Sequence, residues 1–142
     1  MKTILLIDSD EALLKNMAGN LTKLGYAVIG MQEGTTALPM IRQGMPIDLV
    51  VAEHRIDGTD CTEMLASIKK NIPQVPVIMI TADPSIEVYL KALSSGIYEY
   101  LNKPVNMQEL ARIVKKALER KGRLDPVSAT DPYRDMLLKH TA

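Results

Sequence analysis

Five short runs of apolar residues recur along the chain, and segments with a different spacing of apolar positions separate them. The runs are rich in Val, Ile and Leu, which is typical of strands that are buried on both faces of a parallel sheet. They predict strands at residues 3–7, 26–31, 48–53, 75–80 and 97–101.

Between these runs, apolar residues recur every three or four positions, which is the spacing of one face of a helix. The segments predict helices at residues 11–24, 36–43, 60–70, 84–95 and 106–118. Ser9 or Asp10 can cap the first helix, and Asn106 with Glu109 has the spacing of a capping box. Pro39 fits the second helix in its first turn and otherwise kinks it.

The strict alternation of strands and helices implies βαβ crossovers, a parallel sheet and helices on both of its faces. The expected fold class is therefore α/β, with a doubly wound five-stranded parallel sheet of flavodoxin-like (βα)5 topology. In such sheets, ligands bind outside the carboxyl ends of the strands. Functional residues are expected directly after each strand.

The length of 142 residues, with 46% apolar and 24% charged residues, fits one domain. Lys plus Arg and Asp plus Glu each number 17, so the net charge is zero and we expect no nucleic-acid or membrane partner. The single Cys61 excludes an intramolecular disulfide, and no apolar segment is long enough for a signal peptide or a membrane span. We expect a cytoplasmic protein whose partners are proteins.

Polar side chains stand at the carboxyl ends of four predicted strands, and they are Asp8 and Ser9, Glu53, Thr81, and Lys103. Clustered carboxylates suit the hard cation Mg²⁺. A hydroxyl and an ammonium group can hold phosphoryl oxygens, by a hydrogen bond and by charge respectively. A helix cap or an ordinary ion pair would explain any one of these residues, but their occurrence at corresponding positions favours a common site.

Four motifs occur in a fixed order, and they are "ILLIDSD", "DLVVAEHRIDGTDC", "VIMITAD" and "GIYEYLNKP". Together they resemble the receiver domains of bacterial two-component response regulators, over residues 2 to about 121. The resemblance implies phosphoryl transfer from a histidine kinase, with Mg²⁺ bound, to an aspartate at the end of the third strand. It also implies that Thr81 and Tyr100 are switch residues, that Lys103 binds the phosphoryl group, and that partners bind the face of helix 4, strand 5 and helix 5.

Two residues depart from the pattern of this family. Glu53 stands at the phosphoacceptor position, where its additional methylene would misplace the carboxylate for in-line attack. Ser9 stands where the family has a carboxylate that binds the metal, and a hydroxyl is a poorer Mg²⁺ ligand. The remaining metal ligands would be Asp8, Glu53 and the backbone carbonyl of Arg55, so the expected Mg²⁺ site is weak or absent.

These departures lead to the hypothesis of a pseudo-receiver in which Glu53 forms an ion pair with Lys103 and a hydrogen bond to Thr81. The pair would either imitate part of the phosphorylated state or only neutralise two charges, and the sequence leaves both options open. A conventional, Mg²⁺-dependent phosphorylatable receiver is the alternative. A flavodoxin-like enzyme or nucleotide binder is the rival from another class, and the lack of a glycine-rich phosphate loop disfavours it.

After Lys121 the sequence changes to "GRLDPVSATDPYRDMLLKHTA", which is typical of a linker. The expected organisation is a receiver domain at residues 1–121 and a linker or C-terminal tail at residues 122–142. The expected partner is a histidine kinase or a downstream effector, formation of a homodimer is left open, and no enzymatic activity is expected.

Overall fold

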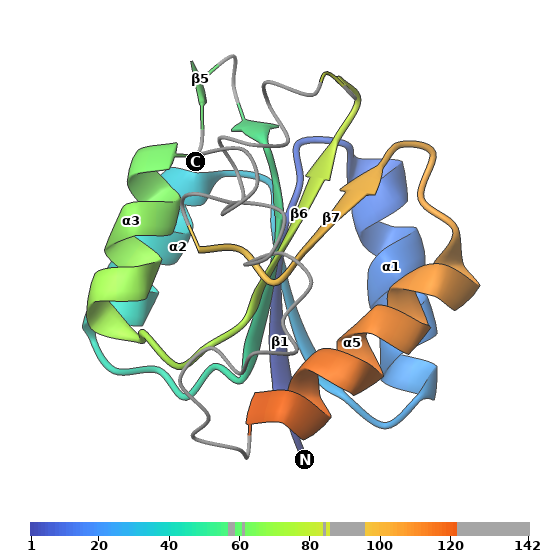
Figure 1. Ribbon diagram of the computed structural model, residues 1–142, viewed down its shortest axis with the longest axis horizontal. Coiled ribbons are helices and arrows are strands. Elements are labelled where there is room, and N and C mark those ends of the chain that lie inside the picture. Colours follow the sequence, from blue (N-terminus) through green and yellow to red (C-terminus); the bar gives the residue numbers. More distant parts are fainter. Residues whose placement is uncertain (57–58, 61, 84, 86–95, 122–142) are drawn as a thin grey trace, which may run out of the picture.

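One parallel sheet forms the centre of the molecule. The computed structural model describes residues 1–56, 59–60, 62–83, 85 and 96–121. Its five-stranded sheet has the order β2-β1-β3-β6-β7, and all neighbouring strands are parallel. These strands are β1 (Thr3–Ile7), β2 (Ala27–Met31), β3 (Leu49–Glu53), β6 (Val77–Thr81) and β7 (Glu99–Asn102). The predicted doubly wound α/β fold is confirmed (Figure 1).

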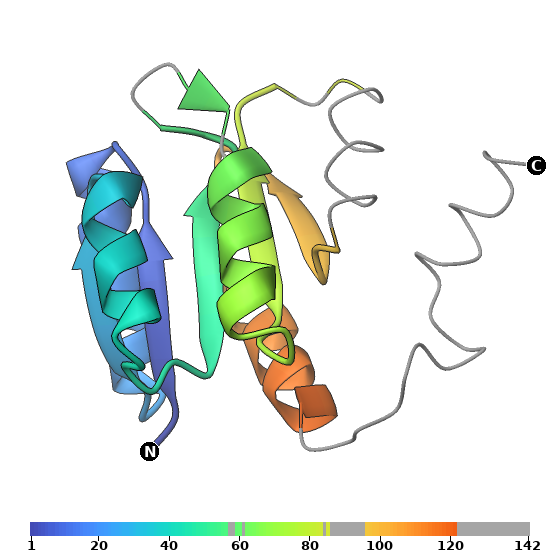
Figure 2. The same cartoon turned by 90° about the vertical axis from the view of Figure 1, so that its left-hand side faces the viewer.

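Helices cover both faces of the sheet. The described helices are α1 (Glu11–Lys23), α2 (Gly34–Arg42), α3 (Thr62–Asn71) and α5 (Met107–Lys121). The first and last pack on one face, while α2 and α3 lie together in front of the other face in Figure 2. Apart from Ser85, the residues of the helix expected at 84–95 lie outside the described part of the chain. Among the helices that the structure describes, none has the length and apolar content needed to cross a membrane.

The central strands are apolar throughout because each of their two faces meets a layer of helices. In β1, Leu5 and Ile7 belong to the core under α2 and α3, whereas Ile4 and Leu6 belong to the core under α1 and α5. All four side chains are at most 1% exposed. Successive side chains of a strand point to opposite faces, so an unbroken apolar run is required here in place of an alternating one.

Two helix starts are fixed by side-chain caps, as the sequence predicts. Asp10 is the N-cap of α1, and its side chain accepts a hydrogen bond from the backbone N–H of Leu13 at 3.1 Å. Asn106 accepts one from the N–H of Glu109 at 3.0 Å, directly before α5. Each cap satisfies one of the N–H groups that a helix start leaves without an intrahelical partner.

Some boundaries differ from the prediction. Helix α2 begins at Gly34, two residues early, so Pro39 is its sixth residue and does not lie in the first turn. Helix α3 begins at Thr62 and not at residue 60, because a short antiparallel pair of strands, β4 (Arg55–Ile56) and β5 (Thr59–Asp60), precedes it. Two-residue strands have no periodicity that a sequence pattern can reveal.

Candidate functional site

The carboxyl ends of four strands bring the predicted site residues to one edge of the sheet. Asp8 follows β1, Glu53 ends β3, Thr81 ends β6, and Lys103 follows β7. The register aligns Glu53 with Ile80, so these ends lie at the same level across the sheet. The sequence places Thr81 after its strand, whereas in the structure it is the last strand residue.

Four of these residues form a charged network that we call the Lys103 cluster, made of Asp8, Ser9, Glu53 and Lys103. The Lys103 ammonium group donates to Glu53 Oε1 at 2.8 Å and to Asp8 Oδ1 at 3.2 Å. Both are ion pairs, and the side chains of Asp8, Glu53 and Lys103 are only 0%, 14% and 19% exposed. The predicted Glu53–Lys103 ion pair is therefore confirmed.

The second oxygen of the Glu53 carboxylate is also occupied. Glu53 Oε2 accepts a hydrogen bond from the Ser9 hydroxyl at 2.8 Å and another from the Ser9 backbone N–H at 3.1 Å. Hydrogen bonds to a charged acceptor are stronger than those between neutral groups. Both oxygens of the carboxylate are consequently engaged, Oε1 by an ammonium group and Oε2 by two neutral donors.

These contacts set the ionisation of the cluster. Burial works to raise the pKa of Glu53, but the hydrogen bonds from Lys103 and Ser9 outweigh burial and hold this pKa below its usual value. Burial works to lower the pKa of Lys103, but its bond to Glu53 and the charges of Asp8 and Glu53 raise this pKa overall. The Glu53–Lys103 pair is charged at neutral pH.

Asp8 is different, because burial dominates and raises the pKa of its carboxyl, with a further contribution from the negative charge of Glu53. Its Oδ1 atom accepts from Lys103 and from the backbone N–H of Asp10. Its Oδ2 atom is buried and has no hydrogen-bond partner within the described part of the chain. Among the described residues, this one carboxylate oxygen of the cluster is therefore left without a hydrogen-bond partner.

The donor set of the Lys103 cluster does not fit a resident Mg²⁺ ion. Both oxygens of Glu53 are engaged by protein donors, and Ser9 supplies a hydroxyl that acts as a donor. No group of three or more His, Cys, Asp or Glu residues is placed to hold a metal within the ranges that the structure describes. A divalent cation would have to compete with the ammonium group of Lys103 for the same carboxylates.

A second network, the Asp83 cluster, joins Thr81, Asp83 and Tyr100. The hydroxyl groups of Thr81 and Tyr100 both donate to the backbone carbonyl of Asp83, at 3.5 and 2.8 Å. The N–H of Asp83 donates in return to Thr81 Oγ1 at 3.0 Å. Tyr100 is 8% exposed, so the ring of the expected switch aromatic is buried. Burial raises the pKa of its hydroxyl, and the charge of Asp83 adds to this effect.

The hydrogen bond expected between Glu53 and Thr81 is wrong. The Glu53 carboxylate is directed to Ser9 and Lys103, while the Thr81 hydroxyl bonds to Asp83. The sequence also missed two roles, that of Ser9 as a donor to Glu53 and that of the Asp83 carbonyl as a common acceptor. A backbone carbonyl has no signature in a sequence, and the Ser9 contact spans 44 residues of chain.

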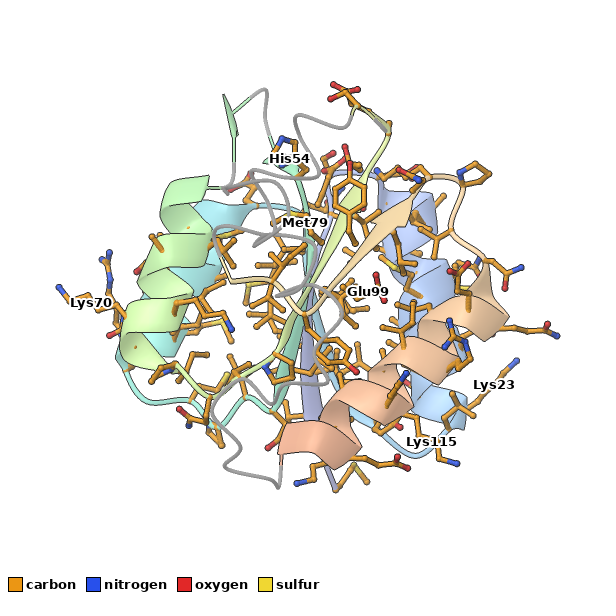
Figure 3. The ribbon with its side chains drawn as sticks, in the orientation of Figure 1. Lys23, His54, Lys70, Met79, Glu99 and Lys115 are labelled. Carbon is orange, nitrogen blue, oxygen red and sulfur yellow. The ribbon has the colours of Figure 1, made fainter. Side chains whose placement is uncertain are left out.

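Two further residues follow Glu53. His54 is buried at 5% exposure, its backbone N–H donates to the carbonyl of Ile80 at 2.6 Å, and Figure 3 shows it at the carboxyl end of the sheet. Arg55, whose carbonyl is an expected metal ligand, is the first residue of β4. Asp57 is outside the described residues.

Comparison with known proteins agrees with the fold. The family model of the response regulator receiver domain matches residues 4–115. The chain belongs to the response regulator receiver domain family. Members of this family are signalling modules of two-component response regulators.

Curated relatives are longer regulators. The chain is 35% identical over 117 residues to the transcriptional regulatory protein GlrR of Escherichia coli, matching 82% of this chain and 26% of that protein. It is 32% identical over 120 residues to the nitrogen assimilation regulatory protein NtrX of Azorhizobium caulinodans. This match covers 82% of this chain and 26% of that protein. The match thus spans about a quarter of the length of these relatives.

Solved structures of receiver domains superpose on almost their whole length. A CheY-like receiver domain protein from Methanospirillum hungatei has a TM-score of 0.80 at 28% identity, covering 86% of this chain and 97% of that one. The beryllofluoride-activated NtrC4 receiver domain dimer has a TM-score of 0.79 at 26% identity, covering 85% and 99%.

Proposed function

We propose that this chain is a pseudo-receiver, which signals through protein contacts and does not accept a phosphoryl group at position 53. The observation that carries the proposal is the ion pair between Glu53 Oε1 and the Lys103 ammonium group at 2.8 Å. The same lysine is the group that the receiver resemblance assigns to phosphoryl binding. With Glu53 bound to it, the chain supplies its own anion to that lysine.

The chemistry of transfer argues in the same direction. An acceptor carboxylate must present a free oxygen in line with the phosphorus atom, and small displacements of reacting groups are costly. Both oxygens of Glu53 accept hydrogen bonds, and its folded-state pKa is low, so this carboxylate is a stabilised and poor nucleophile. We therefore propose no catalytic role for Glu53.

Mg²⁺ binding is proposed to be weak or absent. Its protein ligands would be Asp8, Glu53 and the backbone carbonyl of Arg55, but Glu53 is occupied by Lys103 and Ser9. The orphaned Oδ2 atom of Asp8 favours some residual affinity for a cation, because a buried carboxylate oxygen without a partner is costly.

The proposed partners are a histidine kinase or a downstream effector, bound at the face that contains β7 and α5. Tyr100 lies on β7, so its buried ring and its bond to the Asp83 carbonyl could transmit a change at the edge of the sheet to this face. The NtrC4 receiver structure is a dimer, which makes a homodimer of this chain a further candidate. We propose no nucleic-acid contact by residues 1–121 and a cytoplasmic location.

Intact mass spectrometry tests the proposal. The wild-type chain and a Glu53→Asp variant are incubated with MgCl2 and acetyl phosphate, and an Asp8→Asn variant serves as a control that weakens any metal site. We expect the wild-type mass to stay unchanged. A phosphoryl unit on the wild type, mapped to Glu53 or to a neighbouring acid, would support the alternative of a conventional phosphorylatable receiver.

A further inference from the structure

Ser9 makes two contacts that explain why a glutamate is stable at position 53. Its hydroxyl and its backbone N–H both donate to Glu53 Oε2, at 2.8 and 3.1 Å. The side chain of Ser9 is exposed, so these donors are not forced into place by tight packing. Their direction toward one carboxylate oxygen is therefore a specific feature of this edge of the sheet.

A carboxylate at position 9 would reverse this interaction. It would place a negative charge at hydrogen-bond distance from Glu53 Oε2, next to a second carboxylate at Asp8. Among the side chains that the structure describes, Lys103 is the one cation paired with these carboxylates, and it would face three negative charges. Like charges at such short range disfavour one another unless a cation lies between them. A serine supplies a donor in place of a charge, so Glu53 and Ser9 fit together.

We propose that Ser9 is the positioning residue of Glu53, and that the two residues are a matched pair which replaces a bound cation by the internal cation of Lys103. The inference rests on the proposed pseudo-receiver function and explains how the Lys103 cluster maintains it. Substitution of only one of these two residues by aspartate then fails to restore a metal site, because the other residue still supplies no suitable ligand for the metal.

The first test compares Ser9→Asp with Ser9→Asn, which have nearly the same shape and differ in charge. Thermal unfolding in EDTA is measured for both in the wild-type Glu53 background and in a Glu53→Gln background. We expect Ser9→Asp to melt at a lower temperature than Ser9→Asn when Glu53 is present, and the gap to shrink when position 53 is neutral. An equal gap in both backgrounds would assign the penalty to Asp8 and overturn the proposal.

The second test measures Mg²⁺ affinity from the rise in melting temperature with MgCl2, and by calorimetric titration. We expect the double variant Ser9→Asp/Glu53→Asp to bind Mg²⁺ at least about tenfold more tightly than Glu53→Asp alone, because it regains a carboxylate ligand. Equal affinity of these two variants would show that position 9 has no role in the metal site, and the matched pair would be wrong.

The failure of this inference can be distinguished from the failure of the proposed function. Neither test uses a phosphodonor, so a wild-type chain that takes up a phosphoryl unit would overturn the pseudo-receiver proposal while leaving the Ser9 and Glu53 coupling intact. Conversely, the difference in melting temperature between Ser9→Asp and Ser9→Asn could prove equal in both backgrounds while the wild-type mass stays unchanged. That result would overturn the proposed role of Ser9 and leave the pseudo-receiver proposal standing.

Discussion

At the residue scale, Lys103 is the residue that joins the two carboxylates at the carboxyl ends of the strands. Its ammonium group contacts Glu53 and Asp8, which come from β3 and from the segment after β1. Two carboxylates that share one ammonium group repel each other less than they would without it, since the cation lies within 3.2 Å of both. Removal of one partner therefore changes the balance of the whole cluster.

Replacement of Glu53 by glutamine removes the stronger ion pair and keeps the shape. We expect Glu53→Gln to lower the free energy of unfolding by about 1 to 2 kcal/mol at neutral pH, since the pair is partly solvated and Lys103 retains Asp8. The folded-state pKa of Glu53 lies below its ordinary value of 4.5. The contribution of the Glu53 charge to the free energy of unfolding is thus present above pH 4.5 and is lost as the pH falls through the folded-state pKa. The difference in this free energy between the wild type and Glu53→Gln should therefore become smaller in acid.

Urea unfolding at several pH values measures this difference in the free energy of unfolding. A matched control is Glu11→Gln, which removes the exposed ion pair between Glu11 and Lys15, whose side chains are 63% and 78% exposed. The control should cost less than about 0.5 kcal/mol at neutral pH, as other exposed helix pairs do. Equal losses for the two variants would contradict a special role of Glu53.

The Lys103 cluster could be predicted only in part. The pairing of Glu53 with Lys103 follows from the types of residue at two neighbouring strand ends, and it is confirmed. Ser9 was interpreted only as the loss of a metal ligand, because a sequence shows which group is missing and not which hydrogen bond replaces it. The partner of Thr81 was wrong for a related reason, since the nearer acceptor is a backbone carbonyl.

At the element scale, α2 carries a proline where helices rarely tolerate one. Pro39 has no N–H to donate to the carbonyl of Thr35, four residues earlier, and its ring crowds that carbonyl. The residue is exposed, so packing does not explain its presence. The start of α2 at Gly34 was missed because Gly and Thr are weak helix formers, so propensity favoured a later start.

Replacement of Pro39 by alanine restores this helical hydrogen bond. We expect Pro39→Ala to raise the free energy of unfolding by about 1 kcal/mol or more, after allowing for the greater freedom of alanine in the unfolded chain. Urea unfolding measures the change, and Met40→Ala, at the next position of the same helix, controls for general effects of substitution. A lower stability of Pro39→Ala would show that the proline fixes the helix in a needed shape.

The strands were predicted more accurately than the loops. Every predicted strand is present within two residues at each end, because burial on both faces demands an unbroken apolar run. The antiparallel pair of β4 and β5 was not predicted, and its last residue, Asp60, was assigned to the following helix, since two strands of two residues leave no pattern to detect. Residues 57 and 58 between them lie outside the described part of the chain.

At the scale of the whole molecule, the strand order is that of the flavodoxin-like topology expected from the sequence. The apolar pattern by itself predicts strands, helices and parallel pairing, and the order β2-β1-β3-β6-β7 depends in addition on how the crossovers distribute over the two faces. That order places β1, β3, β6 and β7 side by side, which brings the Lys103 and Asp83 clusters together. A backbone hydrogen bond of 2.8 Å from Lys103 N–H to the Thr81 carbonyl joins the two clusters.

We propose that the receiver module ends with α5, whose last residue is Lys121. The proposal that residues 122–142 are a linker or tail rests on their composition, because these residues lie outside the described part of the chain. The match to longer regulators such as GlrR fits a module that can be joined to other segments.

The central claim is that the ammonium group of Lys103 is already paired with Glu53 of the same chain, so that the Lys103 cluster takes up no phosphoryl group. The most direct test records amide NMR spectra of the wild-type protein in MgCl2, with and without beryllofluoride, which imitates a phosphoryl group. The Ser9→Asp/Glu53→Asp variant is the positive control. We predict superimposable wild-type spectra and shifted signals only in the variant. Saturable shifts of the wild-type signals of Ser9, Thr81 and Lys103 would contradict the account.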